Sequence, residues 1–281
     1  MNTNLKLLNI GCGSSFHPKW TNIDLIAASP AVQAHDIRKS LPYNNDYFDD
    51  CYSSHMIEHL TLQEAHRVIA EAFRVLKPQG IFRVVVPDLE VVAKKYLYVL
   101  KQVKSGDLQA EPNYDWMMLE LYDQATRSFS GGEMGRYLNN SNIKNKAFVR
   151  SRIGFEVEKY WQNKEVTKQK PMWEKLKSKN LVWLLKKIRI MIARILVVLI
   201  AGKEAQNAFD EGLFRNTGEI HRWMYDSFSL KRILAQTGFI DIRCCQANES
   251  KILNFNTYEL DVFDGLVKRP DSLFMEAMKP L

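Results

Sequence analysis

The sequence of 281 residues lacks the cysteine patterns that mark disulfide scaffolds and zinc sites. Its four cysteines, Cys12, Cys51, Cys244 and Cys245, form no CxxC pair and keep no metal-ligand spacing from the histidines. We therefore expect reduced thiols in a cytoplasmic protein. A secretory signal is not expected either, because residues 1–6 are mostly polar and the first apolar run is too short.

The sequence also has no long apolar run that is free of charge. The longest candidate, residues 181–201, contains Lys186, Lys187, Arg189 and Arg194, and such central charges argue against a membrane-spanning helix. On a helix these charges would fall within an arc of about 160° and leave a wider apolar face. That pattern is typical of a helix lying among anionic headgroups at a membrane surface. The alternative is a lid or dimer helix that buries its apolar face on protein.

Composition and charge describe a globular protein with one unusual segment. Apolar residues make up 46% of the sequence and charged residues 25%, which suffices for a hydrophobic core. The net charge of +7 is unevenly spread, since residues 91–215 carry +10 whereas residues 1–90 carry −2 and residues 216–281 carry −1. This excess indicates either an ordinary solvated surface or an anionic partner.

The first ninety residues alternate short strands with helical or loop crossovers. Strands are expected at residues 5–11, 21–25, 31–37, 49–55 and 81–88. A helix is expected from residue 62, with Thr61 and Glu64 as a capping box and with Pro78 and Gly80 at its end. This alternation predicts an α/β fold with a parallel sheet.

The alternation stops after residue 90 and returns near residue 216. The stretch between predicts helices at 91–104 and 114–126, a polar section at 130–146, a Lys-rich tract at 168–180 and the helix at 181–201. Beyond it we expect a helix from Ser227 or Ser229 to about Gln236, then strands at 240–248 and 272–279. We therefore predict a core of residues 1–90 and 216–281, with residues 91–215 as a basic helical insertion.

The stretch "LLNIGCGSSFHPKWTNIDL", residues 7–25, places a glycine pair directly after the first strand. Glycines there let the backbone adopt positive φ and let a ligand approach closely. The third position of a dinucleotide fingerprint is Phe16, and Asp24 follows Gly13 after eleven residues instead of about twenty. Because parallel strands end at one edge of a sheet, Asp24 and Asp36 are expected to face the same ligand.

These segments together resemble a known family. The motifs "LNIGCG", "NIDL", "HDIRKSLPY", "SSHMIEHL" and "EAFRVLKPQGIFRVVVPD" are similar to the class I S-adenosylmethionine-dependent methyltransferases of the type-11 kind. The resemblance covers residues 5–90 and resumes in "GEIHRWMYDSFSLKRILAQTGFIDIR" and "SLFMEAMKP". It implies a Rossmann-like, seven-stranded, mostly parallel sheet with flanking helices, an antiparallel last strand and a helical insertion after strand five.

The resemblance also implies S-adenosylmethionine as the cofactor and assigns residues to its parts. The methionine part would be held by the backbone of residues 9–13, which include Asn9, Gly11, Cys12 and Gly13. The ribose would be bound by Asp24, and the adenine by Asp36 and Ile37. His55 and Met56 would line the adenine and sulfonium side.

The three candidates for a general base are His55, His59 and His221, each with a purely structural role as the alternative. A metal site is not expected, because His55 and His59 lie at i,i+4 spacing across a strand-to-helix junction rather than on one helix. The sequence "SSHMIE" stands where amine methyltransferases of nucleic acid or protein carry an "NPPY"-type motif. This favours transfer to oxygen and disfavours a nucleic-acid partner.

The expected function is methyl transfer to a small-molecule or lipid-linked saccharide acceptor, as in polysaccharide biosynthesis. An anionic membrane surface is a further expected partner, so the expected localisation is cytoplasmic or peripheral at the inner face of the membrane. Two alternatives remain open. One is an NAD-dependent oxidoreductase, and the other is a non-catalytic membrane-associated binding protein with a methyltransferase fold. The sequence leaves the oligomeric state open.

Overall fold

The computed structural model describes the chain except for residues 1–4, 155–156, 159–160 and 162–180. The predicted Lys-rich tract at 168–180 lies outside the described residues. The side chains of residues 181–183 and 186 lie outside them as well.

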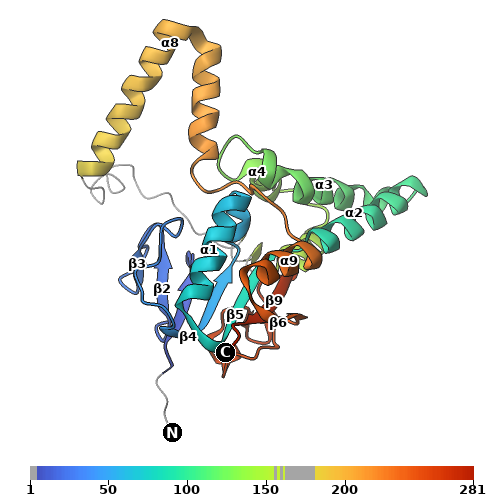
Figure 1. The fold of residues 1–281 in the computed structure, drawn as a ribbon. Helices are drawn as coiled ribbons and strands as arrows, with labels where there is room; N and C mark the ends of the chain where they lie inside the picture. Colours follow the sequence, from blue (N-terminus) through green and yellow to red (C-terminus); the bar gives the residue numbers. More distant parts are fainter. Residues whose placement is uncertain (1–4, 155–156, 159–160, 162–180) are drawn as a thin grey trace.

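Seven strands form one central sheet (Figure 1). In chain order they are β1 (Leu7–Ile10), β2 (Thr21–Asp24), β3 (Val32–Ala34), β4 (Phe48–Ser54), β5 (Leu76–Pro87), β6 (Ile240–Cys245) and β9 (Ser272–Met278). Their order across the sheet is β3-β2-β1-β4-β5-β9-β6. The first five are parallel, and β9 runs antiparallel between β5 and β6. The predicted Rossmann-like sheet with an antiparallel last strand is therefore confirmed.

Both faces of the sheet are covered by other elements, and the buried residues of β5 show this on each face. Its alternate residues point to opposite faces. Phe82, Val84 and Val86 join a core with α1 (Leu62–Val75) and α9 (Ser227–Thr237), which lie side by side in Figure 1. The intervening residues face a second core, built on the segment after β6 with η3 (Phe255–Tyr258), β7 (Val262–Phe263) and β8 (Leu266–Val267). None of these last three elements was predicted.

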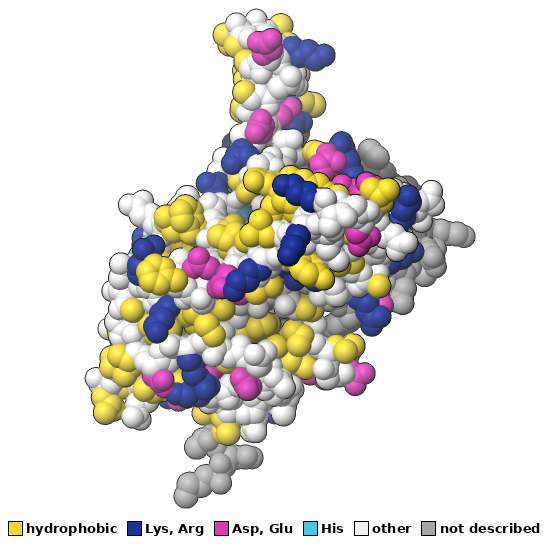
Figure 2. Space-filling view, turned by 90° about the vertical axis from the view of Figure 1, so that its right-hand side faces the viewer, with side chains coloured by type: hydrophobic (Ala, Val, Ile, Leu, Met, Phe, Trp, Pro, Cys, Tyr) yellow, Lys and Arg dark blue, Asp and Glu magenta, His cyan; other side chains and the backbone are white. Residues whose placement is uncertain are grey.

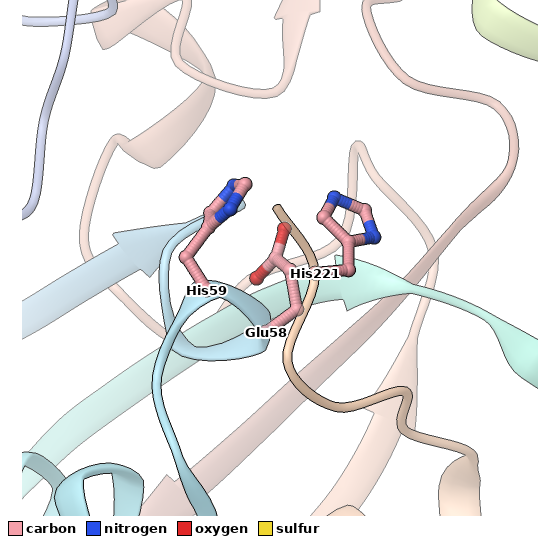
Figure 3. A group of neighbouring side chains, drawn as sticks. All are labelled: Glu58, His59 and His221. Atoms are coloured by element: carbon pink, nitrogen blue, oxygen red, sulfur yellow. The ribbon is translucent and has the colours of Figure 1, made fainter. Parts of the chain in front are cut away.

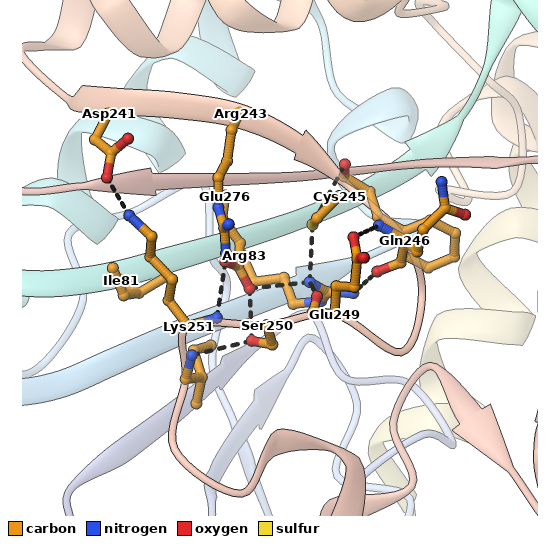
Figure 4. A network of polar contacts seen from close by, with 12 residues as sticks. Ile81, Arg83, Asp241, Arg243, Cys245, Gln246, Glu249, Ser250, Lys251 and Glu276 are labelled. Atoms are coloured by element: carbon orange, nitrogen blue, oxygen red, sulfur yellow. Dashed lines mark hydrogen bonds and ion pairs between the residues drawn. The ribbon is translucent and has the colours of Figure 1, made fainter.

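A buried ion network fixes that segment to the sheet. Arg83 of β5 is fully buried and donates hydrogen bonds to Asp261 at 2.7 Å and Glu276 at 2.9 Å. Its guanidinium also donates to the backbone carbonyls of Gln246, Ala247 and Glu249 (Figure 4). A buried cation is stable only when it is paired in this way.

The boundaries of α1 and β5 correct one expectation. The capping box of Thr61 and Glu64 is present, but α1 ends at Val75, before Pro78 and Gly80 are reached. Leu76 already has extended backbone angles, so β5 begins five residues earlier than predicted. Gly80 is required inside this strand, because a Cβ there would lie 2.5 Å from the carbonyl oxygen of Asp49.

The insertion after β5 is helical and has a hydrophobic cluster of its own. It contains α2 (Leu89–Lys104), η2 (Leu108–Ala110), α3 (Glu111–Thr126), α4 (Gly132–Asn139) and α5 (Lys146–Ile153). Trp116 and Met117 are fully buried at the centre of this cluster. The helices expected at 91–104 and 114–126 are present, and α4 forms in the section expected to be only polar. The division into a core and an insertion stays a prediction.

The long helix α8 (Leu181–Arg215) is a hairpin of two helical arms. Gly202 has φ +82° and ψ −179°, which breaks the helix and turns the chain back. The arms are joined by an ion pair of 2.5 Å between Arg194 and Asp210. They project from the body of the molecule (Figures 1 and 2). In the described part of the chain, every helix is too short or too polar to cross a membrane.

Candidate active site

The glycine turn after β1 is fixed by the end of the neighbouring strand. The backbone N–H groups of Gly11 and Cys12 both donate to the carbonyl of Ile23, at 2.9 and 3.1 Å. Gly11 has φ +69°, and a Cβ at this position would lie 2.3 Å from Cγ of Met56. Gly13 also has positive φ, but a Cβ there would meet nothing within 4 Å. The first glycine is thus needed for packing, and the second leaves the backbone accessible.

The carboxylate of Asp24 at the end of β2 supports the same turn. Its Oδ2 accepts a hydrogen bond from the N–H of Gly13 at 2.9 Å, and its Oδ1 accepts one from the N–H of Ile26 at 3.2 Å. Each carboxylate oxygen can accept a further hydrogen bond. Asp24 can therefore orient the turn and still bind hydroxyl groups of a ligand.

Two adjoining cavities lie at this edge of the sheet. The first, of about 170 Å³, is lined by residues that include Asn9, Gly11, Cys12, Gly13 and His55. The second, of about 410 Å³, is lined by residues that include Gly11, Gly13, Asp24, Asp36, Ile37, His55, Met56 and His59. The two cavities share Gly11, Gly13 and His55. The predicted methionine-side and nucleoside-side residues therefore fall into two neighbouring compartments of one site.

Two residues in the first cavity have supporting roles. The buried amide of Asn9 donates to the carbonyl of Ser15 at 3.0 Å and to Oδ1 of Asn22 at 3.3 Å. This ties the end of the glycine turn to β2. Burial, with a contribution from the charge of Asp24, raises the pKa of Cys12 to about 11. The Cys12 thiol is therefore neutral at pH 7 and is no nucleophile.

The strand predicted at 31–37 is shorter than expected, because β3 ends at Ala34 and Asp36 lies two residues beyond it. Its two carboxylate oxygens accept hydrogen bonds from Arg38 at 2.8 and 3.0 Å. These bonds hold its pKa below the usual value, although partial burial opposes the shift. An adenine amino group would share the Asp36 carboxylate with Arg38.

His55 stands where three cavities meet. It has φ +48°, an uncommon backbone conformation for a residue other than glycine. Its Nε2 lies 2.8 Å from Oγ of Ser272, and its Nδ1 lies 3.3 Å from Oε1 of Glu58. Besides the two cavities above, it borders a third of about 210 Å³, whose lining also includes Pro87 of the core and Glu120 of the insertion.

The other two candidate bases lie on either side of a buried carboxylate. Figure 3 shows Glu58 between the imidazoles of His59 and His221, with the rings of the two histidines 4.8 Å apart. His59 lines the larger cavity, whereas His221 lines none of the described cavities. Burial lowers the pKa of His221 to about 4, against the charge of Glu58. Burial opposes ionisation of Glu58, but His55, His59 and His221 outweigh it and hold its pKa at about 2.

Residues 8–84 match the model of a family described as a methyltransferase domain. These residues hold the glycine turn, Asp24 and the strand end at His55. This stretch of the chain is similar to the methyltransferase domain family. S-adenosylmethionine is the cofactor that this similarity implies.

Solved structures are also similar to the chain, and two of the three described next are titled as methyltransferases. One from Thermotoga maritima, titled as a possible histamine N-methyltransferase, is 11% identical, covers 98% of this chain and 82% of its own, and has a TM-score of 0.37. One from Archaeoglobus fulgidus is also 11% identical, with 98% and 86% covered and a TM-score of 0.39. The [4+2]-cyclase SpnF is 25% identical over 29% of this chain and 38% of its own, with a TM-score of 0.24. No curated protein matches the chain.

The residues of the methyltransferase site fit its cofactor. The cofactor has no pyrophosphate, so the third glycine of a dinucleotide fingerprint is not needed. The backbone at Gly13 is open to close approach, and the carboxylate of Asp24 lies beside it. We expect Asp24 to hold the ribose and residues 9–13 to hold the methionine part.

The expectations from sequence assigned no role to Glu58, to Ser272 or, apart from His221, to the segment 216–222. The larger cavity is also lined by Asn216, Thr217, Gly218 and Arg222. In the same segment, the carbonyl oxygen of Ile220 contacts Nδ1 of His59, which lies 161 positions earlier in the chain. One signal was available, because Glu58 is a charged residue inside the apolar run "HMIEHL".

Proposed function

We propose that this methyltransferase moves the methyl group of S-adenosylmethionine to an oxygen atom of a small-molecule or lipid-linked saccharide acceptor. The observation that carries the proposal is the position of His55. This residue borders the two cavities assigned to the cofactor and also the cavity between the sheet and the insertion. A methyl donor and an acceptor bound on the two sides of His55 would be adjacent, as an in-line displacement requires.

The chain supplies positioning and a proton acceptor, because the sulfonium donor is already activated. The Nδ1 atom of His59 lies 3.1 Å from the carbonyl oxygen of Ile220. A carbonyl can only accept, so in the neutral imidazole Nδ1 carries the proton and Nε2 keeps its lone pair. His59 lines the larger cavity, which meets the third cavity at His55, so this lone pair is suited to take the proton of an acceptor hydroxyl that reaches past His55.

The third cavity suits a polar acceptor with apolar faces. Its lining combines Glu120 and Gln124 with Met134 and Leu138. The carboxylate of Glu120 is held in place by Arg152 at 2.5 Å and by the indole N–H of Trp116 at 3.0 Å. A fixed carboxylate beside aliphatic surface is the kind of site that binds hydroxyl groups of a sugar ring.

The first arm of α8 supports the lipid-linked alternative. Its exposed apolar side chains are Leu184, Leu185, Ile188, Met191, Ile192, Ile195, Leu196, Val198, Leu199 and Ile200. Arg189 lies on the same arm, and Figure 2 shows that the hairpin stands clear of the body. We propose that this arm lies on an anionic membrane surface. Arg194, which is paired with Asp210, contributes less charge than the sequence alone suggested.

Calorimetric titration of the purified chain with S-adenosylmethionine and with NAD tests the cofactor. Binding of the first and not the second is expected, and the reverse would support the oxidoreductase alternative. Incubation with methyl-labelled S-adenosylmethionine and extracted acceptors then tests turnover. Label in a lipid-extractable saccharide supports the lipid-linked acceptor, and label in a water-soluble product supports a small molecule. Cofactor binding with no transfer to either fraction would favour the non-catalytic alternative.

A further inference from the structure

Three potential metal ligands meet at the edge of the cofactor site. Glu58 and His59 come from the 3-10 turn η1 (Ile57–His59), and His221 comes from the segment before α9. One ligand atom from each side chain can be chosen so that all lie within 4.8 Å of one another (Figure 3). The backbone holds these segments together, because the N–H groups of Arg222 and Trp223 both donate to the carbonyl of Glu58.

The carboxylate of Glu58 is buried in surroundings that do not compensate its negative charge. The residue is 0% exposed, and neither of its carboxylate oxygens has a hydrogen-bond partner among the residues that the structure describes. The nearest basic group is Nδ1 of His55, 3.3 Å from Oε1. Buried carboxylates are normally paired and hydrogen-bonded, or they coordinate a metal ion.

The two histidines are oriented as metal ligands are. His59 directs Nδ1 at the carbonyl of Ile220, which fixes its tautomer and leaves Nε2 free to donate a lone pair. This carbonyl–histidine arrangement is typical of metal sites. His221 is only 5% exposed, and its Nδ1 has no hydrogen-bond partner in the described structure.

We propose that Glu58, His59 and His221 bind one divalent cation of the first transition row. Two imidazoles and one carboxylate are a donor set for such ions, and they leave coordination positions open. Ligand atoms about 2.0–2.2 Å from a zinc ion would have to be closer together than 4.8 Å, so the side chains would move inward by about 1 Å on binding. The site is thus a preformed cluster that closes on the ion.

The location suggests what the ion does, and this step rests on the proposed function. His59 lines the larger cavity, so an open coordination position on that side would face the cofactor and an acceptor hydroxyl that reaches past His55 from the third cavity. One carboxylate against a doubly charged ion leaves a net charge of +1 in the cluster, which would stabilise the deprotonated oxygen of an acceptor hydroxyl. The ion would then take over the task assigned above to the lone pair of His59.

Metal uptake by the full chain tests the proposal without any measurement of methyl transfer. The protein is stripped with a chelator, dialysed and titrated with Zn²⁺ by calorimetry and with Co²⁺ by visible absorption. We expect one ion per chain and coordination bands of Co²⁺. Glu58→Gln and His221→Asn should each weaken binding by about 10-fold or more, since each removes one ligand. His66→Gln, which changes an exposed histidine of α1, should leave binding unchanged.

Several outcomes would overturn the proposal. Wild-type protein that takes up neither ion contradicts it, and so does equal loss of binding in Glu58→Gln and His66→Gln. If removal of a buried ligand unfolds the chain, His59→Gln provides the second variant, because His59 is the least buried of the three. Uptake of metal by a chain that does not bind S-adenosylmethionine would contradict the proposed function and leave the metal site standing.

Discussion

The backbone N–H of Gly13 donates a hydrogen bond to Oδ2 of Asp24 at 2.9 Å. This contact joins the turn after β1 to the end of β2. The crossover between these strands contains no helix, so no helix N-terminus is present to stabilise the turn. The carboxylate fulfils that task, and the same carboxylate is the expected ribose ligand.

Replacement of Asp24 should therefore affect cofactor binding more than folding. Asp24→Ala removes a charged acceptor whose hydrogen bonds are worth about 1.5–3 kcal/mol each, which corresponds to a loss of affinity of about 10-fold or more. Asp24→Asn keeps one acceptor oxygen and should lose less. Calorimetry with S-adenosylmethionine measures both variants. Unchanged affinity in Asp24→Ala would show that the ribose is bound elsewhere.

The two glycines of the turn should respond differently to the same substitution. Gly11→Ala places a Cβ 2.3 Å from Cγ of Met56 at positive φ, so overpacking of about 1–3 kcal/mol adds to backbone strain of about 1–2 kcal/mol. Gly13→Ala carries the strain alone, since a Cβ there meets nothing within 4 Å. Urea unfolding should show a larger loss of stability for Gly11→Ala. Equal losses would mean that Met56 moves away at no cost.

Asp50 makes the stability of the fold depend on pH, and the direction of this dependence follows from its raised pKa. Burial raises its pKa to about 6, from 3.8 in the unfolded chain. Between these values the native state holds a proton that the unfolded state has released, so stability falls as the pH rises from 3.8 to 6. Asp50→Asn, whose Oδ1 can still accept the N–H of Ile81, should stabilise the protein at pH 7 by up to about 3 kcal/mol. This gain should vanish below about pH 4 in urea unfolding.

The neighbouring Asp49 provides the matched control. Its carboxylate pairs with Lys77 at 2.6 Å and accepts the backbone N–H of Lys6 at 2.7 Å. Burial opposes the shift, but these partners hold the pKa of Asp49 below its usual value. Asp49→Asn should therefore destabilise the protein at pH 7. A stabilising effect of both substitutions would indicate general relief of negative charge rather than burial of Asp50.

Arg83 should be the most sensitive residue of the buried network. Arg83→Met leaves Asp261 and Glu276 without their buried cation, which typically costs about 3–5 kcal/mol. Arg243 also pairs with Glu276, at 3.0 Å, but its side chain is 40% exposed. Arg243→Met should therefore cost about 1 kcal/mol or less. Urea unfolding of both variants tests this, and similar losses would contradict the assigned role of burial.

Membrane association through α8 predicts a difference between its two arms. Leu199 is 75% exposed on the first arm, and Leu199→Glu should reduce co-sedimentation with vesicles that contain phosphatidylserine. Asn207→Glu adds the same charge to an exposed position of the second arm and should have a smaller effect. A wild-type chain that stays in the supernatant and elutes as a dimer would show instead that a second copy covers the arm.

Local chemistry in the sequence determined much of the fold. The alternation of short apolar runs predicted six of the seven sheet strands close to their true positions, although β5 starts well before its predicted position. Thr61 and Glu64 predicted the start of α1 because the two partners of a capping box lie only three positions apart. The glycine pair and Asp24 predicted a nucleoside site because strand ends of a parallel sheet meet at one edge. Each of these signals depends either on residues a few positions apart or on the rule that parallel strands end at the same edge of a sheet.

Tertiary structure alone decided the rest. His59 and His221 meet around Glu58 because the segment before α9 is hydrogen-bonded to η1, and no spacing in the sequence encodes that contact. Arg83 reads as an ordinary charged residue of a strand until Glu276, 193 positions away, is placed beside it. The sequence predicted a helix at 181–201, but not that Gly202 turns the chain back into a second helical arm that ends at Arg215. Buried charge and chain reversal depend on what packs nearby, which only the folded chain specifies.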